Sequence, residues 1–110
     1  MKVLIVDDSR LARLELNNQL RQCEAVQVVG EAENAQQAFD LVLKLQPDLL
    51  LLDIDMPGGD GFSLLQQLDE QSSLPHVIFV TAFDQYALKS FDYQAKDYLL
   101  KPVTSERLQL

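Results

Sequence analysis

The sequence predicts an α/β domain: a doubly wound parallel sheet of five strands with helices on both faces. Short runs rich in leucine, isoleucine and valine alternate along the chain with longer segments of helical period, and this alternation is typical of repeated strand–helix units. Most of the runs are continuously apolar, as strands buried on both faces are. The length of 110 residues and the hydrophobic content of 47% fit one globular domain with its own core.

The apolar runs set the positions of the strands. Five strands are expected, over residues 2–7, 26–31, 48–53, 76–81 and 97–100. The second of them alternates apolar and polar residues at its start. We therefore expect it to be the most exposed strand of the sheet.

The segments between the strands predict the helices. Five are expected, over residues 9–22, 34–46, 61–71 and 84–93 and from residue 104 onward. Four begin with residues that favour the N-cap: Ser9, Asn34, Asp84 and Thr104. Only about two turns of the last helix precede the end of the sequence, fewer than the usual three. We therefore expect residues 1–110 to be one domain of a longer chain that continues into a separate output domain.

Polar side chains stand where the predicted strands end. Asp7 and Asp8 end the first strand, Asp53 ends the third, Thr81 ends the fourth and Lys101 follows the fifth. Because α/β sheets bind their ligands at the carboxyl ends of parallel strands, we expect these five residues to share one cleft. Carboxylates hold a hard divalent cation through oxygen, while a lysine and a hydroxyl hold the oxygens of a phosphoryl group.

Composition excludes several other functions. The formal net charge of −8 argues against nucleic-acid binding by this domain itself, because affinity for DNA depends on Lys and Arg. The apolar run after Met1 is too short for a signal peptide or a membrane span, so no membrane association is expected. The single cysteine, Cys23, cannot form an internal disulfide, which suits a reducing compartment. We expect the protein to be cytoplasmic.

Four short motifs occur in an order and at a spacing that resemble a known family. They are Asp7-Asp8, Asp53 followed by Met56-Pro57 and Gly61, Thr81-Ala82, and Lys101-Pro102. Together they resemble the receiver domain of a two-component response regulator over essentially the whole chain. The resemblance implies a flavodoxin-like fold with strand order 2-1-3-4-5 and a sensor histidine kinase as phosphodonor.

A finer resemblance concerns the output. The stretches 81–91 and 97–102 are similar to regulators of the LytR/AlgR-like subgroup, whose output is a LytTR-type DNA-binding domain. This implies a transcription regulator that reaches DNA through an output domain outside this chain. Phosphorylation is expected to promote a homodimer through the surface of the fourth predicted helix and the fifth strand, which includes Tyr86, Leu88, Lys89, Lys96 and Asp97.

Phosphoryl transfer needs a positioned nucleophile and positive charge around the transferring oxygens. Asp53 is the expected nucleophile and site of phosphorylation. Mg²⁺ is the expected cofactor, bound directly by Asp8, Asp53 and the backbone carbonyl of Asp55, and through water by Asp7. Lys101 is expected to pair with one phosphoryl oxygen, and Thr81 to donate a hydrogen bond to another.

Three positions are expected to tune the switch. By resemblance, Asp55 and Phe83, each two residues beyond a site residue, adjust how long the acyl phosphate lasts. Phe83 is bulky enough to obstruct an attacking water molecule. Tyr98 matches the family's switch aromatic, which is expected to turn inward as Thr81 moves toward the phosphoryl group.

Two other functions compete with a self-modifying switch, which is not a turnover enzyme. The first is an aspartyl-phosphate phosphatase of the haloacid dehalogenase type, suggested by Asp53-Ile54-Asp55. Such enzymes have their nucleophile on the first strand and need a larger chain. The second is a receiver-like interaction module that is not phosphorylated, which would typically lack Asp53 or Lys101. Covalent uptake from acetyl phosphate separates the three.

Overall fold

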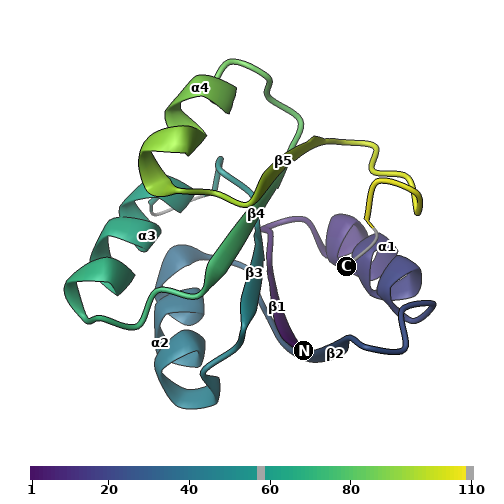
Figure 1. The fold of residues 1–110 in the computed structure, drawn as a ribbon, viewed down its shortest axis with the longest axis horizontal. Coiled ribbons are helices and arrows are strands. Elements are labelled where there is room, and N and C mark those ends of the chain that lie inside the picture. The colour runs from purple at the N-terminus through teal and green to yellow at the C-terminus, as the bar shows by residue number, and fades with distance from the viewer. Residues whose placement is uncertain (57–58, 109–110) are drawn as a thin grey trace.

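The structure, a computed structural model that describes residues 1–56 and 59–108, contains a parallel five-stranded sheet in the order β2-β1-β3-β4-β5 (Figure 1). The strands are β1 Lys2–Val6, β2 Gln27–Ala32, β3 Leu49–Leu52, β4 His76–Thr81 and β5 Asp97–Leu100. The predicted strand order and parallel pairing are therefore confirmed. Predicted strand ends differ from the observed ends by at most one residue, and Asp7 and Asp53 each stand one residue beyond their strand.

The helices divide between the two faces of the sheet (Figure 1). They are α1 Arg10–Leu20, α2 Ala35–Leu45, α3 Gly61–Glu70 and α4 Ala87–Ser90, which a 3-10 helix at Phe91–Tyr93 extends. The helices α2 and α3 cover one face, and α1 covers the other. Each face has its own apolar cluster, with Leu50 and Phe79 in one and Leu51 and Val80 in the other. Alternate residues of each strand thus enter opposite halves of the core.

The central strands are buried, and β2 is exposed at the edge. All four leucines of β3 are buried, whereas β2 buries only Ala32 fully. This confirms the predicted exposure of the second strand. The difference follows from the sheet order, because β2 has one neighbouring strand and β3 has two.

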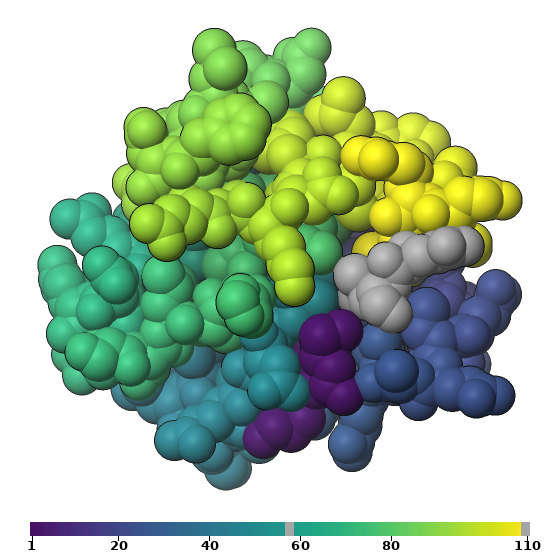
Figure 2. All heavy atoms as spheres, viewed as in Figure 1, coloured from purple at the N-terminus to yellow at the C-terminus, as the bar shows by residue number. Residues whose placement is uncertain are grey.

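The first two residues of the chain contact both the segment after α1 and the end of α2. The amino group of Met1 donates to the carbonyl of Ala25 (2.7 Å), and Nζ of Lys2 donates to the carbonyl of Leu45 at the end of α2 (3.0 Å). Figure 2 shows the N-terminal residues, in purple, between the blue segment after α1 and the blue-green α2. These contacts fix the amino end of β1, whose other end bears Asp7.

Three of the four predicted capping residues accept side-chain hydrogen bonds from the backbone. Ser9 accepts a hydrogen bond from the N–H of Ala12, Asn34 from that of Gln37 and Thr104 from that of Arg107. Such bonds satisfy N–H groups that have no partner within the helix. Residues 105–108, however, form a turn, and the predicted helix from residue 104 is not formed within the described chain. Its remaining residues, 109–110, lie outside the described part.

The fourth predicted helix is shorter than expected. Residues 84–86 are not helical, and Tyr86 occupies the N-cap position of α4 without a side-chain bond, so the prediction of Asp84 as a cap was wrong. Other contacts hold this segment. The hydroxyl of Tyr98 donates to the carbonyl of Phe83, and the N–H of Ala87 bonds to the carbonyl of Asp84 in a turn that precedes α4.

Candidate functional site

Three acids lie together at the carboxyl edge of the two central strands. Asp7 follows β1 and Asp53 follows β3, and the N–H of Asp53 donates to the carbonyl of Val6 (2.9 Å). Carboxylate oxygens of Asp7, Asp8 and Asp53 lie within 4.8 Å of one another. Asp7 and Asp53 are 1% and 6% exposed, whereas Asp8 is exposed. The arrangement offers two buried carboxylates and one that solvent reaches.

Lys101 joins the two buried acids. It follows β5, where its N–H donates to the carbonyl of Thr81 (2.8 Å). Its Nζ lies 2.7 Å from Oδ2 of Asp7 and 3.2 Å from Oδ2 of Asp53. The structure therefore brings the predicted lysine and the predicted acids into one cluster.

Buried carboxylate oxygens in this cluster lack hydrogen bonds. Oδ1 of Asp53 has no hydrogen-bond partner among the described residues, and neither has Oδ2 of Asp7. The Asp7 oxygen is in an ion pair with Lys101 at 2.7 Å, so its charge is balanced. Oδ1 of Asp53 is the atom most in need of a donor or a cation, because an unsatisfied buried oxygen is costly.

The charges shift the pKa values of two groups. Burial raises the pKa of Asp53 above its ordinary value of 3.8; Lys101 and Thr81 oppose this shift, and the charge of Asp7 adds to it. Burial lowers the pKa of Lys101, but its contact with Asp7 and the charge of Asp53 outweigh burial and raise that pKa above 10.5. Lys101 is thus held as a cation, whereas burial disfavours the ionised form of Asp53.

Thr81 and Tyr98 lie on neighbouring strands beside the cluster. Thr81 ends β4, is fully buried, and accepts a hydrogen bond from the N–H of Phe83 through Oγ1 (3.3 Å). Tyr98 is half-buried, its ring lies 6.0 Å from that of Phe79, and its hydroxyl donates to the carbonyl of Phe83. Both predicted switch residues therefore hold the backbone of Phe83, whose own side chain is 38% exposed.

Two residues at the start of α3 have contacts that the sequence analysis did not predict. Gly61 begins α3, and a Cβ there would lie 2.9 Å from the backbone oxygen of Asp53. Asp60 caps α3 by accepting a hydrogen bond from the N–H of Ser63 (2.8 Å). An N-cap preference just before an apolar helix is the signal that could have identified Asp60.

Asp55 lies two residues beyond Asp53 and outside the carboxylate cluster. Its side chain is exposed and is not one of the three clustered carboxylates. The expected ligand is its backbone carbonyl, on which side-chain exposure has no bearing. Pro57, part of the predicted motif after Asp53, lies outside the described residues.

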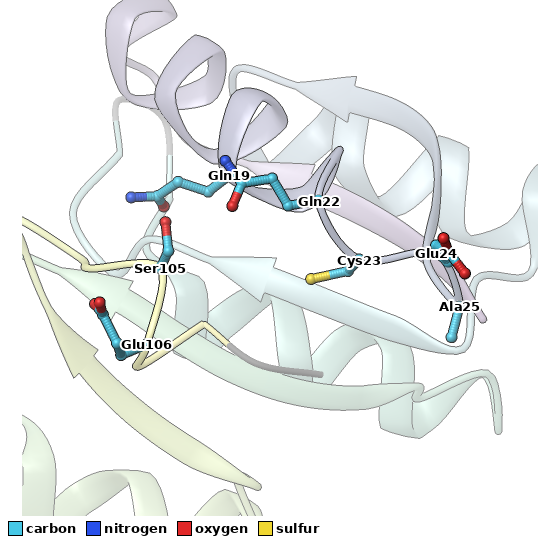
Figure 3. Close-up of a pocket in the computed structure, with 7 residues that line it drawn as sticks. All are labelled: Gln19, Gln22, Cys23, Glu24, Ala25, Ser105 and Glu106. Atoms are coloured by element: carbon cyan, nitrogen blue, oxygen red, sulfur yellow. The ribbon is translucent and has the colours of Figure 1, made fainter.

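A pocket of about 500 Å³ lies apart from the acids, between the end of α1 and the turn at 105–108 (Figure 3). It is lined by Gln19, Gln22, Cys23, Glu24, Ala25, Ser105 and Glu106. None of the predicted site residues belongs to it. Its lining has two carboxylates and no lysine or arginine, which does not suit a phosphoryl group.

The fold and the cluster define a doubly wound α/β domain with an acidic, lysine-containing site at the carboxyl edge of its sheet. The chain belongs to the family described as the response regulator receiver domain, which matches residues 3–110. The resemblance predicted from the sequence is thereby confirmed. The match does not favour the alternative of a haloacid dehalogenase-type phosphatase.

Individual relatives support the same assignment. The chain is 46% identical to the sensory transduction protein LytT of Bacillus subtilis, covering 99% of this chain and 45% of LytT. It is 47% identical to the transcriptional regulatory protein BtsR of Salmonella typhimurium, with the same two coverages. The response regulatory domain of mrkE from Klebsiella pneumoniae superposes with a TM-score of 0.89 at 31% identity, covering 98% of this chain and 88% of that one. The chain thus spans about half the length of the curated relatives that it matches.

Among the described residues, no helix is both long and apolar enough to cross a membrane.

Proposed function

We propose that this receiver domain is a phosphorylation switch in which Asp53 accepts a phosphoryl group from a sensor histidine kinase. A carboxylate oxygen of Asp53 forms the new bond to phosphorus, and the bond between phosphorus and the histidine nitrogen breaks with its electron pair going to nitrogen. The domain modifies itself and does not turn over a substrate. The observation that carries this proposal is the buried Asp53 with one oxygen unpartnered and the other 3.2 Å from Lys101.

The three clustered carboxylates fit a divalent cation. Their oxygens lie within 4.8 Å of one another, and oxygen ligands are those that Mg²⁺ prefers. In this proposal Asp8, Asp53 and the backbone carbonyl of Asp55 hold Mg²⁺ directly, and Asp7 acts through water. Bound Mg²⁺ supplies positive charge against which the transferring phosphoryl oxygens are stabilised.

Lys101 and Thr81 bind the phosphoryl group in this proposal. The pKa of Lys101 is raised by the acids, so its ammonium is charged throughout the physiological pH range. On phosphorylation it exchanges its contact with Asp53 for a phosphoryl oxygen. Thr81 turns its hydroxyl from the N–H of Phe83 to a second oxygen.

The movement of Thr81 reaches the surface through Phe83. Thr81 accepts from the N–H of Phe83, and Tyr98 donates to the carbonyl of the same residue. Loss of the bond to Thr81 therefore lets the backbone of Phe83 move relative to Tyr98. Tyr98 then turns inward and the β4–α4 segment shifts. Phe83 and Asp55 adjust the lifetime of the acyl phosphate, Phe83 by obstructing water.

The output of the switch is a change of oligomeric state. Phosphorylation promotes a homodimer through the surface formed by Tyr86, Leu88, Lys89, Lys96 and Asp97. In support, Leu88 is 82% exposed, and Phe91 beside it is 73% exposed. Such apolar surface is a common mark of an interface. The dimer would place two copies of a DNA-binding output domain, of the LytTR type, on paired half-sites.

Two further features belong to the proposal. The domain itself does not bind DNA, since its net charge is −8. The protein works in the cytoplasm without a membrane partner, where the lone Cys23 stays reduced.

Mass spectrometry after treatment with acetyl phosphate and Mg²⁺ tests the acceptor. The parent should gain one phosphoryl group, and Asp53→Asn should gain none. Asp55→Asn is the matched control, because it makes the same change two residues away, and it should still be labelled. Labelling of Asp53→Asn would place the nucleophile elsewhere.

Thermal unfolding tests the metal ligands. Mg²⁺ at 100 times its Kd should stabilise the parent by about 2.7 kcal/mol. Asp8→Ala should lose this response. In the absence of metal it should unfold at a higher temperature than the parent, because one of three mutually repelling carboxylates has been removed. Equal Mg²⁺ affinity in Asp8→Ala and the parent would contradict the ligand set.

Sedimentation of the unmodified and phosphorylated protein tests the dimer. The phosphorylated form should be heavier, and Leu88→Asp should keep it monomeric while still being labelled. Identical masses in both states over a range of concentrations would refute the dimer.

A further inference from the structure

Arg13 reaches back from α1 to the backbone that bears the acids. Its Nη1 donates to the carbonyl of Asp7 (2.7 Å). Its side chain is only 13% exposed, so the bond is shielded from water. A charged donor at this distance makes one of the stronger classes of hydrogen bond. The guanidinium therefore holds the chain at the point where β1 becomes the turn carrying Asp7 and Asp8.

The guanidinium is itself held in place by the edge strand. Its Nε lies 3.1 Å from Oε1 of Glu31 on β2. Nδ2 of Asn17 donates to the other oxygen of Glu31 (2.9 Å) and lies 3.2 Å from the carbonyl of Arg13. A planar fork that is bonded on two sides has little freedom to rotate. Arg13, Asn17 and Glu31 thus form a brace between α1, β2 and the carbonyl of Asp7.

The brace complements the other contacts of Asp7. The N–H of Asp7 donates to the carbonyl of Ala32 (3.0 Å), and Oδ1 accepts from the N–H of Ser9 (2.9 Å). These two bonds fix the nitrogen side of the residue and its carboxylate. The bond from Arg13 fixes the remaining polar atom, the carbonyl oxygen, which belongs to the peptide unit leading to Asp8.

We propose that Arg13 is a positioning residue for cation binding, which orients the peptide between Asp7 and Asp8 so that both carboxylates face Asp53. This inference rests on the proposed Mg²⁺ site. It assigns a role in that site to a residue that does not contact the cation.

If Arg13 acted only through its charge, its removal would change cation affinity in the opposite direction. Removing a positive charge near three carboxylates would strengthen cation binding, whereas loosening the turn would weaken it. The charge of Arg13 is already balanced by Glu31 at 3.1 Å, so the electrostatic effect should be small. We therefore expect the loss of position to dominate.

Calorimetric titration with Mg²⁺ alone tests the inference. Loss of an outer-shell partner typically weakens metal binding about 10–100-fold. Because Arg13 acts through the backbone, we expect Arg13→Ala to raise the Kd about fivefold. The Kd of Arg13→Lys should lie between those of the parent and Arg13→Ala. A lysine reaches the carbonyl of Asp7 but lacks the planar guanidinium that also binds Glu31. Arg21→Ala, which removes the same charge just after α1, is the matched control and should bind as the parent does.

A second readout separates positioning from general destabilisation. The rate of labelling by acetyl phosphate should fall in Arg13→Ala at low Mg²⁺ and return to the parent rate at saturating Mg²⁺. A Kd in Arg13→Ala equal to or below that of the parent would overturn the role of Arg13 alone. A parent that does not bind Mg²⁺ would overturn the metal site and this inference with it. Should Arg13→Ala fail to fold, a parental Kd in Arg13→Lys would overturn the inference.

Discussion

Nζ of Lys101 lies 3.2 Å from Oδ2 of Asp53, and this ion pair joins the end of β5 to the end of β3 across β4. The carboxylate is 8% exposed and the lysine side chain 26%. The same ammonium is 2.7 Å from Asp7. One lysine thus balances two buried acids, and it is the only cation that forms an ion pair with either of them among the described residues.

Lys101→Ala should destabilise the domain because it leaves both acids buried without a counter-ion. Breaking a buried pair costs about 3–5 kcal/mol, and the partial exposure of Lys101 reduces our expectation to about 2 kcal/mol. Urea unfolding measures the loss. Lys96→Ala, an exposed lysine before the same strand, should change stability by less than about 0.5 kcal/mol. An equally small effect of Lys101→Ala would mean that the acids are neutral.

Asp53→Asn should stabilise the domain at neutral pH. Burial raises the pKa of Asp53 in the folded state, with help from Asp7 and against Lys101, so the folded protein resists its ionisation. Stability is then lost as the pH rises from 3.8 through the raised pKa, and the asparagine avoids this loss. The advantage of Asp53→Asn should therefore shrink as the pH falls toward 3.8.

Urea unfolding between pH 4 and pH 8 gives the comparison. Asp69→Asn, on the exposed surface of α3, is the control and should show no comparable gain. A gain from Asp53→Asn that grew toward acid pH would contradict the direction of the pKa shift.

The strands and the acid cluster were predictable because both follow from local patterns. Continuous apolar runs mark buried parallel strands, and the carboxyl ends of such strands meet at one edge. Asp7, Asp53 and Lys101 could therefore be placed together from the sequence. The caps Ser9 and Asn34 were equally local, because each bonds to an N–H three residues on.

The parts that could not be predicted depend on contacts between distant residues. The segment before α4 is bonded by Tyr98, which lies 15 residues beyond the Phe83 carbonyl that it binds. The brace from Arg13 to Glu31 spans 18 residues. The close approach of Gly61 to Asp53 is a feature of packing that spacing alone does not reveal.

Gly61→Ala should disturb Asp53 directly. The added Cβ would lie 2.9 Å from the backbone oxygen of Asp53 and 3.3 Å from Cα of Ile54, and neither atom can move without moving the site. Overpacking of this kind costs about 1–3 kcal/mol, more than the gain of up to about 1 kcal/mol from alanine in a helix. We expect both lower stability and slower labelling by acetyl phosphate.

Gly30→Ala is the matched control for this substitution. A Cβ at Gly30 would meet the ends of leucine side chains, the nearest being those of Leu4 and Leu45 at 3.3 Å, and these can shift by a few tenths of an ångström. Its labelling rate should equal that of the parent. Normal labelling of Gly61→Ala would show that the loop absorbs the methyl group without moving Asp53.

Tyr98→Phe should free the β4–α4 segment while keeping the aromatic packing. The hydroxyl of Tyr98 donates to the carbonyl of Phe83, and its loss should cost about 1 kcal/mol. The ring 6.0 Å from Phe79 is unchanged by the substitution, so the core should stay intact. Amide hydrogen exchange should rise across residues 83–87 and stay constant in β4.

Tyr93→Phe is the matched control. The ring of Tyr93 packs on Phe62, and its hydroxyl has no hydrogen bond within the described chain, so this substitution should leave exchange unchanged. If Tyr98→Phe also left it unchanged, the hydroxyl would not be what holds Phe83, and the coupling from Thr81 to the surface would need another path.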